Sequence, residues 1–172
     1  MSRSRLLFLA AAVAAPAAAS ATESVYTPLD LDRCRVIEQV EEGASVLWSC
    51  PGHGAVPLLV ATGDGRFDVD AGVANEEWET LPAFNNPGPR VEWRLDGTAP
   101  VAIIYRLISA AAEHPGSALF VETVGREGAP GCTVAIIHGA LPDANARARE
   151  IADRRAASFR CGVDAMERIS AD

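Results

Sequence analysis

The 172-residue chain carries 15 basic and 23 acidic residues, which gives a net charge of −8, and it contains no lysine. Such an acidic protein repels phosphate backbones and anionic lipid headgroups, so the composition argues against nucleic-acid binding and membrane-surface binding. Two explanations of the charge stay open, namely solubility alone and a basic partner.

The N-terminal segment has the three-part layout of a secretory signal peptide. A basic start, Ser2–Arg5, precedes an apolar run over residues 6–19, and Ala19-Ser20-Ala21 is a small-x-small cleavage signature. The apolar run of about 14 residues is shorter than the roughly 20 that a membrane-spanning helix needs, although a retained anchor is the alternative. We therefore expect a signal peptide over 1–21 and a single periplasmic or secreted domain over 22–172, with no membrane span after cleavage.

Eight strands are predicted from apolar alternation and turn signals. They cover residues 33–40, 45–50, 56–62, 66–70, 91–95, 101–108, 118–124 and 132–138. The run over 101–108 is almost entirely apolar, which is typical of a central strand. In the run over 66–70, Phe67 and Val69 alternate with acidic residues, so we expect a half-buried strand whose acidic face is solvated.

The stretch over 72–90 is the longest irregular segment, and long ordered loops are often functional. Two helical turns are expected within it, over 73–81, before several prolines forbid regular structure. A C-terminal helix is predicted from Asp143, its N-cap, to Arg160, with Gly162 after its end. The tail over 163–172 is expected to be loosely ordered.

The chain has an even number of cysteines, and exported thiols usually pair. They are Cys34, Cys50, Cys132 and Cys161. Although four cysteines allow three pairings, a hairpin centred on Glu42 places Cys34 opposite Cys50. The strand from Cys132 and the returning helix have lengths that bring Cys161 back near Cys132. The predicted fold is α+β: a curved antiparallel sheet of about eight strands, a hairpin meander, with one C-terminal helix packed on it and two disulfides.

No pattern of catalytic or metal-ligating residues is evident. A nucleophile at Cys50 beside His53 requires a free thiolate, which a disulfide removes. The three histidines, which include His114 and His138, share no ligand spacing on one element. The acidic residues near position 70 suggest calcium at first, but an EF-hand loop needs glycine where Val73 stands. We therefore predict no catalytic residue, no metal and no cofactor.

One segment beside the irregular loop has the aromatic and arginine composition of interface anchors. The predicted partner-binding residues are Phe84, Asn85, Asn86, Arg90, Trp93 and Arg94. The alternative is that Trp93 packs in the core while Arg94 points to solvent.

Three stretches resemble a family of small exported proteobacterial proteins of unknown function. They are Ser24–Cys34, Thr80–Arg94 and Pro142–Asp153, the last running on to Cys161. The resemblance implies export and the cysteine framework, and it brings no activity or functional residue with it. We expect a non-enzymatic binding or interaction protein of the cell envelope whose partner, an envelope protein or another ligand, is unknown. An acidic inhibitor of a basic hydrolase is one specific form of this hypothesis, and a small cofactorless hydrolase is the alternative.

Overall fold

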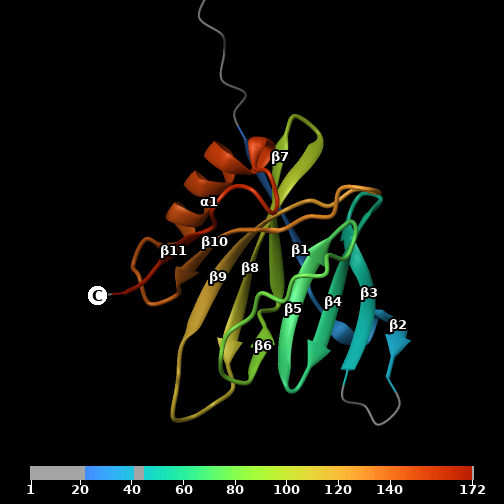
Figure 1. Cartoon of the computed structure of the whole chain (residues 1–172), viewed down its shortest axis with the longest axis vertical. Coiled ribbons are helices and arrows are strands. Elements are labelled where there is room, and N and C mark those ends of the chain that lie inside the picture. The colour runs from blue at the N-terminus through green and yellow to red at the C-terminus, as the bar shows by residue number, and fades with distance from the viewer. Residues whose placement is uncertain (1–21, 41–44, 172) are drawn as a thin grey trace, which may run out of the picture.

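The computed structural model describes residues 22–40 and 45–171, in which strands β1 to β11 form two sheets. Sheet A has seven strands in the order β1-β7-β8-β9-β10-β11, and β6 pairs with β8 at its side. Sheet B has four strands in the order β2-β3-β4-β5. The prediction of one curved sheet of about eight strands was therefore wrong, although the mostly-sheet fold with one helix is confirmed (Figure 1).

The bounds of the elements are as follows. Sheet A contains β1 (Glu23–Pro28), β6 (Asn85–Pro87), β7 (Arg90–Asp96), β8 (Ala99–Ser109), β9 (Ser117–Thr123), β10 (Thr133–His138) and β11 (Glu167–Ile169). Sheet B contains β2 (Arg35–Gln39), β3 (Ser45–His53), β4 (Val56–Gly63) and β5 (Arg66–Ala71). The helix α1 spans Ala144–Arg155, and short 3₁₀ helices span Leu31–Arg33 and Ala156–Ser158.

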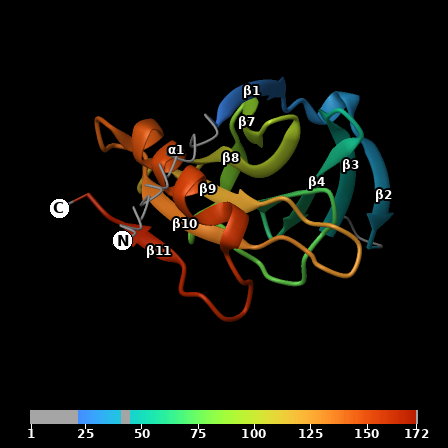
Figure 2. The same ribbon diagram turned by 90° about the horizontal axis from the view of Figure 1, so that it is seen from above.

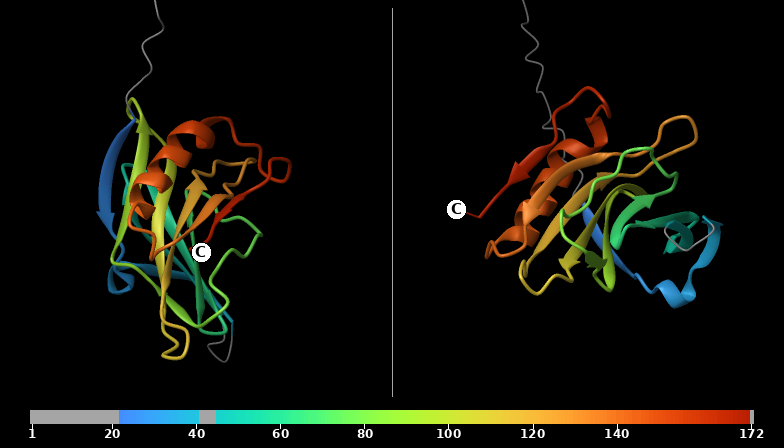
Figure 3. Two further views of the ribbon diagram at one scale, coloured as in Figure 1. Left: turned by 90° about the vertical axis from the view of Figure 1, so that its left-hand side faces the viewer. Right: turned by 60° about the horizontal axis from the view of Figure 1, so that its bottom comes forward.

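Sheet A lies between α1 on one face and sheet B on the other (Figures 2 and 3). This arrangement of three layers encloses two apolar clusters, one between the sheets and one between sheet A and the helix. The cluster between the sheets includes Val60 and Val69 of sheet B and Trp93 of sheet A. The cluster under the helix includes Ile104 of β8 and Ile151 of α1. The prediction of a central strand over 101–108 is confirmed, because β8 is covered on both faces and so needs an almost continuous apolar sequence.

Three strands and the C-terminal tail differ from the expectation. β1, β6 and β11 are short strands that the sequence pattern did not indicate. β11 pairs in parallel with β10, so this part of the tail belongs to sheet A. The two helical turns expected over 73–81 do not form, and the segment runs as an irregular loop. These elements depend on contacts with distant strands, which local periodicity does not report.

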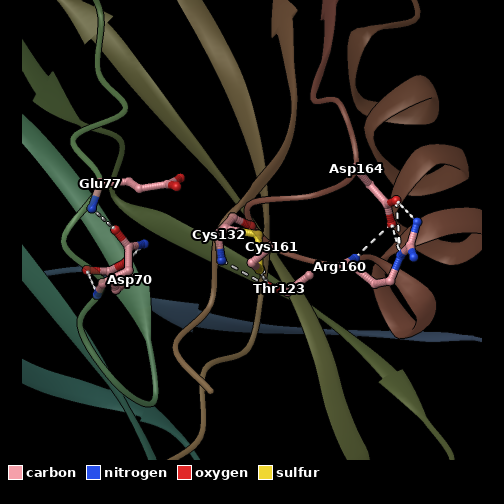
Figure 4. The surroundings of a disulfide bond; sticks show 8 residues. Asp70, Glu77, Thr123, Cys132, Arg160, Cys161 and Asp164 are labelled. Atoms are coloured by element: carbon pink, nitrogen blue, oxygen red, sulfur yellow. Dashed lines mark hydrogen bonds and ion pairs between the residues drawn. A yellow bond between two sulfur atoms is a disulfide. The ribbon is translucent and has the colours of Figure 1, made fainter. Parts of the chain in front are cut away.

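Both predicted disulfides are confirmed. Cys34 and Cys50 are joined with a Cα–Cα distance of 4.2 Å, and Cys132 and Cys161 with one of 5.7 Å. The turn residue used to derive the first pair, Glu42, lies outside the described residues. In the second pair, the Cys132 N–H donates to Thr123 Oγ1 at 3.0 Å, which ties the disulfide to β9 (Figure 4).

The helix begins close to its predicted start and ends earlier than expected. Asp143 makes no side-chain capping bond and instead forms an ion pair of 2.9 Å with Arg147. The α-helical part stops at Arg155, followed by a 3₁₀ turn. No helix among the described residues is long and apolar enough to cross a membrane.

Candidate functional site

The edge of sheet B formed by β5 is covered by side chains instead of another strand. The Phe67 N–H donates to Asn85 Oδ1 at 3.2 Å, and the Thr80 hydroxyl donates to the Phe67 carbonyl at 2.6 Å. The Val69 N–H donates to Asp68 Oδ1 at 3.0 Å. A buried strand edge must satisfy its free backbone groups in this way, because an unpaired buried N–H costs roughly 1–3 kcal/mol.

A cluster of buried carboxyl groups lies at this covered edge. Asp68 and Asp70 of β5 are only 5 % and 4 % exposed, and Glu122 of β9 is 1 % exposed. The prediction that the acidic face of 66–70 is solvated was therefore wrong. Contacts from sheet A bury these groups: the Tyr105 hydroxyl lies 3.4 Å from Asp68 Oδ1, and Glu122 shares a hydrogen bond with Asp70.

Burial changes the protonation of this cluster. Burial raises the pKa of Asp68 to about 7, with a further contribution from the charge of Asp70. Burial also raises the pKa of Asp70 to about 6, against an opposing hydrogen bond from Glu122. Burial and the two neighbouring aspartates raise the pKa of Glu122 well above its ordinary value. Glu122 Oε1 has no hydrogen-bond partner among the described residues. A proton held by Glu122 allows the carboxyl groups of Glu122 and Asp70 to hydrogen-bond to each other.

A groove runs over the outer face of sheet B and ends on this cluster. It has a volume of about 240 Å³, and its walls come from β2, β3, β4, β5 and the loop that follows β5. We call it the acidic groove, because five acidic residues line it and no basic residue does. These are Glu38, Asp68, Asp70, Glu76 and Glu77.

The loop over 72–84 supplies one wall of the acidic groove. Asn75 fixes the start of this loop, because its side-chain amide donates to Asp70 Oδ1 and its Oδ1 accepts the Glu77 N–H at 2.7 Å. Trp78 lies over β4, where its ring would be 3.7 Å from a Cβ at Gly63. Trp78 is nevertheless 42 % exposed, so the groove has an aromatic rim.

The other edge of sheet B, β2, borders the same groove and is open. Its residues are all exposed, and β3 is its only partner strand among the described residues. Val36, Ile37 and Val40 are exposed there although they are large and apolar. The disulfide at Cys34 fixes the start of this strand to β3. A free backbone edge with exposed apolar side chains is a surface on which another strand can pair.

The structure separates the predicted partner-binding residues. Trp93 is a core residue with no exposed surface, and its Nε1–H donates to Thr27 Oγ1 at 2.8 Å. Arg94 is buried and pairs with Asp153 at 2.7 Å, and Asn85 is buried at the covered edge of β5. These three do not present their side chains to a partner in this structure.

The remaining members of that set are at the surface. Phe84 and Asn86 line a shallow cavity near the turn that joins β4 to β5, and Phe84 is 60 % exposed. Arg90 is exposed and lines a separate cavity beside α1. Sequence reasoning missed the acidic groove because its carboxylates come from β2, β5 and a loop, and only folding brings them together.

The histidines lie away from the acidic groove. His53 packs against Trp93, with ring centroids 5.9 Å apart. His114 and His138 line one cavity of about 550 Å³, which has no carboxylate in its wall. No group of metal-ligating residues occurs in the described part of the chain.

Searches of known protein families, curated proteins and solved structures find no match to this chain. The geometry of the site is therefore the basis for any functional assignment.

Proposed function

We propose that this chain is an exported binding protein of the cell envelope whose acidic groove and open β2 edge hold an extended, basic segment of a partner protein. The observation that carries the proposal is that the open β2 edge borders the acidic groove, where Glu38, Glu76 and Glu77 are exposed. Two disulfides and the absence of a membrane-crossing helix in the described residues are compatible with export.

Strand addition supplies the affinity in this proposal. An extended segment that pairs with β2 forms backbone hydrogen bonds, and its alternate side chains point to one face. On the groove side these side chains meet Glu38, Glu76 and Glu77, which favour lysine or arginine. Trp78 and Val40 offer apolar contacts between the charges. The segment is therefore basic and amphipathic, and a basic hydrolase is one class of partner that carries such segments on its surface.

The test uses the mature protein, residues 22–172, and a ten-residue peptide of alternating lysine and valine. We expect saturable binding to the protein and none to a matched peptide of alternating glutamate and valine. Methylation of alternate backbone nitrogens of the first peptide removes its hydrogen-bond donors and should weaken binding about tenfold or more. Equal affinity of the methylated peptide would contradict strand addition.

Two triple variants distinguish binding in the acidic groove from general attraction by the negative charge of the protein. Glu38→Gln/Glu76→Gln/Glu77→Gln neutralises the groove. Asp96→Asn/Glu113→Gln/Glu127→Gln removes the same charge from exposed sites elsewhere. The groove variant should weaken binding about tenfold or more, and the control by about twofold. Equal losses would show non-specific attraction and reject the groove as the site. Egg-white lysozyme, a basic hydrolase, serves as a folded probe for inhibition with the same variants.

A small hydrolase is the second candidate function. The observation that favours it is Asp68, which lines the acidic groove and has a pKa raised by burial to about 7. A carboxyl group with such a pKa can donate a proton at neutral pH. A screen of glycoside, ester and peptide substrates tests it: turnover that Asp68→Asn abolishes supports catalysis, and background rates in the wild-type protein reject it.

A further inference from the structure

A second cavity lies on the opposite side of sheet A, at the N-terminal end of α1. Its volume is about 310 Å³, and β1, β7, β8 and α1 all contribute to its wall. Three arginines from three different elements line it: Arg90 of β7, Arg106 of β8 and Arg149 of α1. We call this cavity the arginine pocket.

The positive charge of the arginine pocket is only partly balanced. Glu92 is the one acidic residue in its wall. The Arg149 Nε–H donates to Glu92 Oε1 at 2.7 Å, and Arg94 lies 3.6 Å from the same oxygen. Although burial opposes ionisation, hydrogen bonds from Arg149 and Ser24 lower the pKa of Glu92. This carboxylate is therefore ionised, and its charge is balanced by Arg149. Arg90 and Arg106 form no ion pair within the described residues, so their two positive charges are not balanced by a carboxylate contact.

Two of the three guanidinium groups are held in place before any ligand binds. Arg106 Nη1 donates to Ser117 Oγ at 2.7 Å, and a Cβ at Gly139 would stand 2.6 Å from that nitrogen, so glycine leaves the room it needs. Arg149 is fixed by Glu92 and by the Tyr26 hydroxyl, which accepts from its Nη2 at 3.0 Å. Donors that are already ordered lose less conformational entropy on binding.

We propose that the arginine pocket binds a small organic anion that carries a carboxylate or phosphate group. Arginine presents a planar fork of N–H donors that matches both groups. Tyr26, Ile104 and Leu119 line the same cavity and offer apolar contact to the organic part. The volume is at the lower end of ligand cavities, about 300–1,000 Å³, so the ligand is small.

The test is a titration of the mature protein with inorganic phosphate, phenyl phosphate and benzoate at constant ionic strength, followed by calorimetry or NMR. We expect saturable binding of at least one aromatic anion with a Kd below about 1 mM, and tighter binding of phenyl phosphate than of inorganic phosphate. Arg90→Gln should weaken binding about tenfold, because it removes an exposed, unpaired guanidinium. Arg33→Gln, at an exposed arginine that does not line the pocket, is the matched control and should leave the affinity unchanged.

Arg106→Gln is the second variant, and its thermal midpoint is measured with its affinity because Arg106 also bonds Ser117. Arg106→Lys keeps the charge without the fork and should restore part of the affinity. The proposal is overturned if none of the three probes binds saturably up to about 10 mM, or if Arg33→Gln loses as much affinity as Arg90→Gln. The groove variants do not touch this pocket, so failure of the groove proposal leaves this result independent.

Discussion

Sheet B ends in two edge strands, β5 and β2, whose free backbone groups meet different surroundings. At β5 the backbone groups are bonded by Asn85, Thr80 and Asp68, and sheet A covers the edge. At β2 every residue is exposed, and Val36 and Ile37 are apolar side chains that are 48 % and 44 % exposed.

The difference shows that one sheet can have a covered edge and an open edge. Covering β5 requires buried carboxyl groups, which costs desolvation energy unless they are protonated or hydrogen-bonded. Leaving β2 open carries an aggregation liability, which natural proteins usually reduce with charge, proline or a cover. β2 carries the charged residues Arg35 and Glu38 and a register shift, but Val36 and Ile37 stay exposed on it. These two apolar side chains are the reason for proposing that a partner covers this edge.

The largest effect on stability should come from replacing each of two tryptophans by alanine, one buried between the sheets and one on the rim of the acidic groove. Trp93 is fully buried against β3, where its ring would stand 3.0 Å from a Cβ at Gly52, whereas Trp78 is on the rim of the acidic groove. Trp93→Ala should lower the free energy of unfolding by about 3–5 kcal/mol, and Trp78→Ala should change it by about 0.5 kcal/mol or less. Urea denaturation measures both. Similar losses for the two variants would show that the groove wall is part of the core.

The next effect is a dependence of stability on pH that originates at the covered edge. A carboxyl group with a raised pKa in the folded state contributes stability below its ordinary pKa, and this contribution is lost as the pH rises through the folded value. Burial raises the pKa of Asp68 to about 7 and of Asp70 to about 6, so stability should fall between pH 5 and pH 8. We expect the Tm to drop by roughly 5–10 °C over this interval.

Two variants check the origin of that pH dependence. Asp68→Asn and Asp70→Asn remove the titrating groups at the covered edge, so they should flatten the Tm profile above pH 5. Glu38→Gln, in the exposed wall of the acidic groove, is the matched control and should leave the profile unchanged. An unchanged slope in both aspartate variants would place the titration elsewhere in the molecule.

The smallest effect compares single residues on the two edges. Asn85→Ala leaves the Phe67 N–H without its acceptor and should cost about 1–3 kcal/mol. Ile37→Ser, on the open edge, should change stability by about 0.5 kcal/mol or less and weaken binding of the lysine–valine peptide. If Ile37→Ser destabilises the fold as much as Asn85→Ala does, the β2 edge is not free in the folded protein.

Part of the fold could be predicted from local sequence. Alternation located most of the strands, the almost continuous apolar run located β8 between two layers, and opposed positions in a hairpin gave the Cys34–Cys50 pair. In the structure the pairing register of β2 and β3 shifts by one residue between Val36 and Glu38. The cysteines come before this shift, where the pairing of Arg35 with Ser49 matches the register used for the prediction. These features succeeded because each depends on residues close together in the chain.

The site could not be predicted in the same way. Alternation along β5 shows that Asp68 and Asp70 share a face, but it does not show that Tyr105 and Glu122 approach that face from another sheet. The same limit applies to Trp93, whose aromatic character fits a core as well as an interface. Arg90, Arg106 and Arg149 are spread over much of the sequence, and no local signal marks them as neighbours.

The sequence by itself determined the acidic charge, the cysteine pairs, the position of the helix and the approximate positions of eight strands. Only the tertiary structure decided that the strands divide into two sheets, that one edge of sheet B is buried while the other is open, and that arginines gather beside α1. The physical reason is that periodicity specifies the two faces of a strand, whereas long-range packing decides what covers each face and each edge.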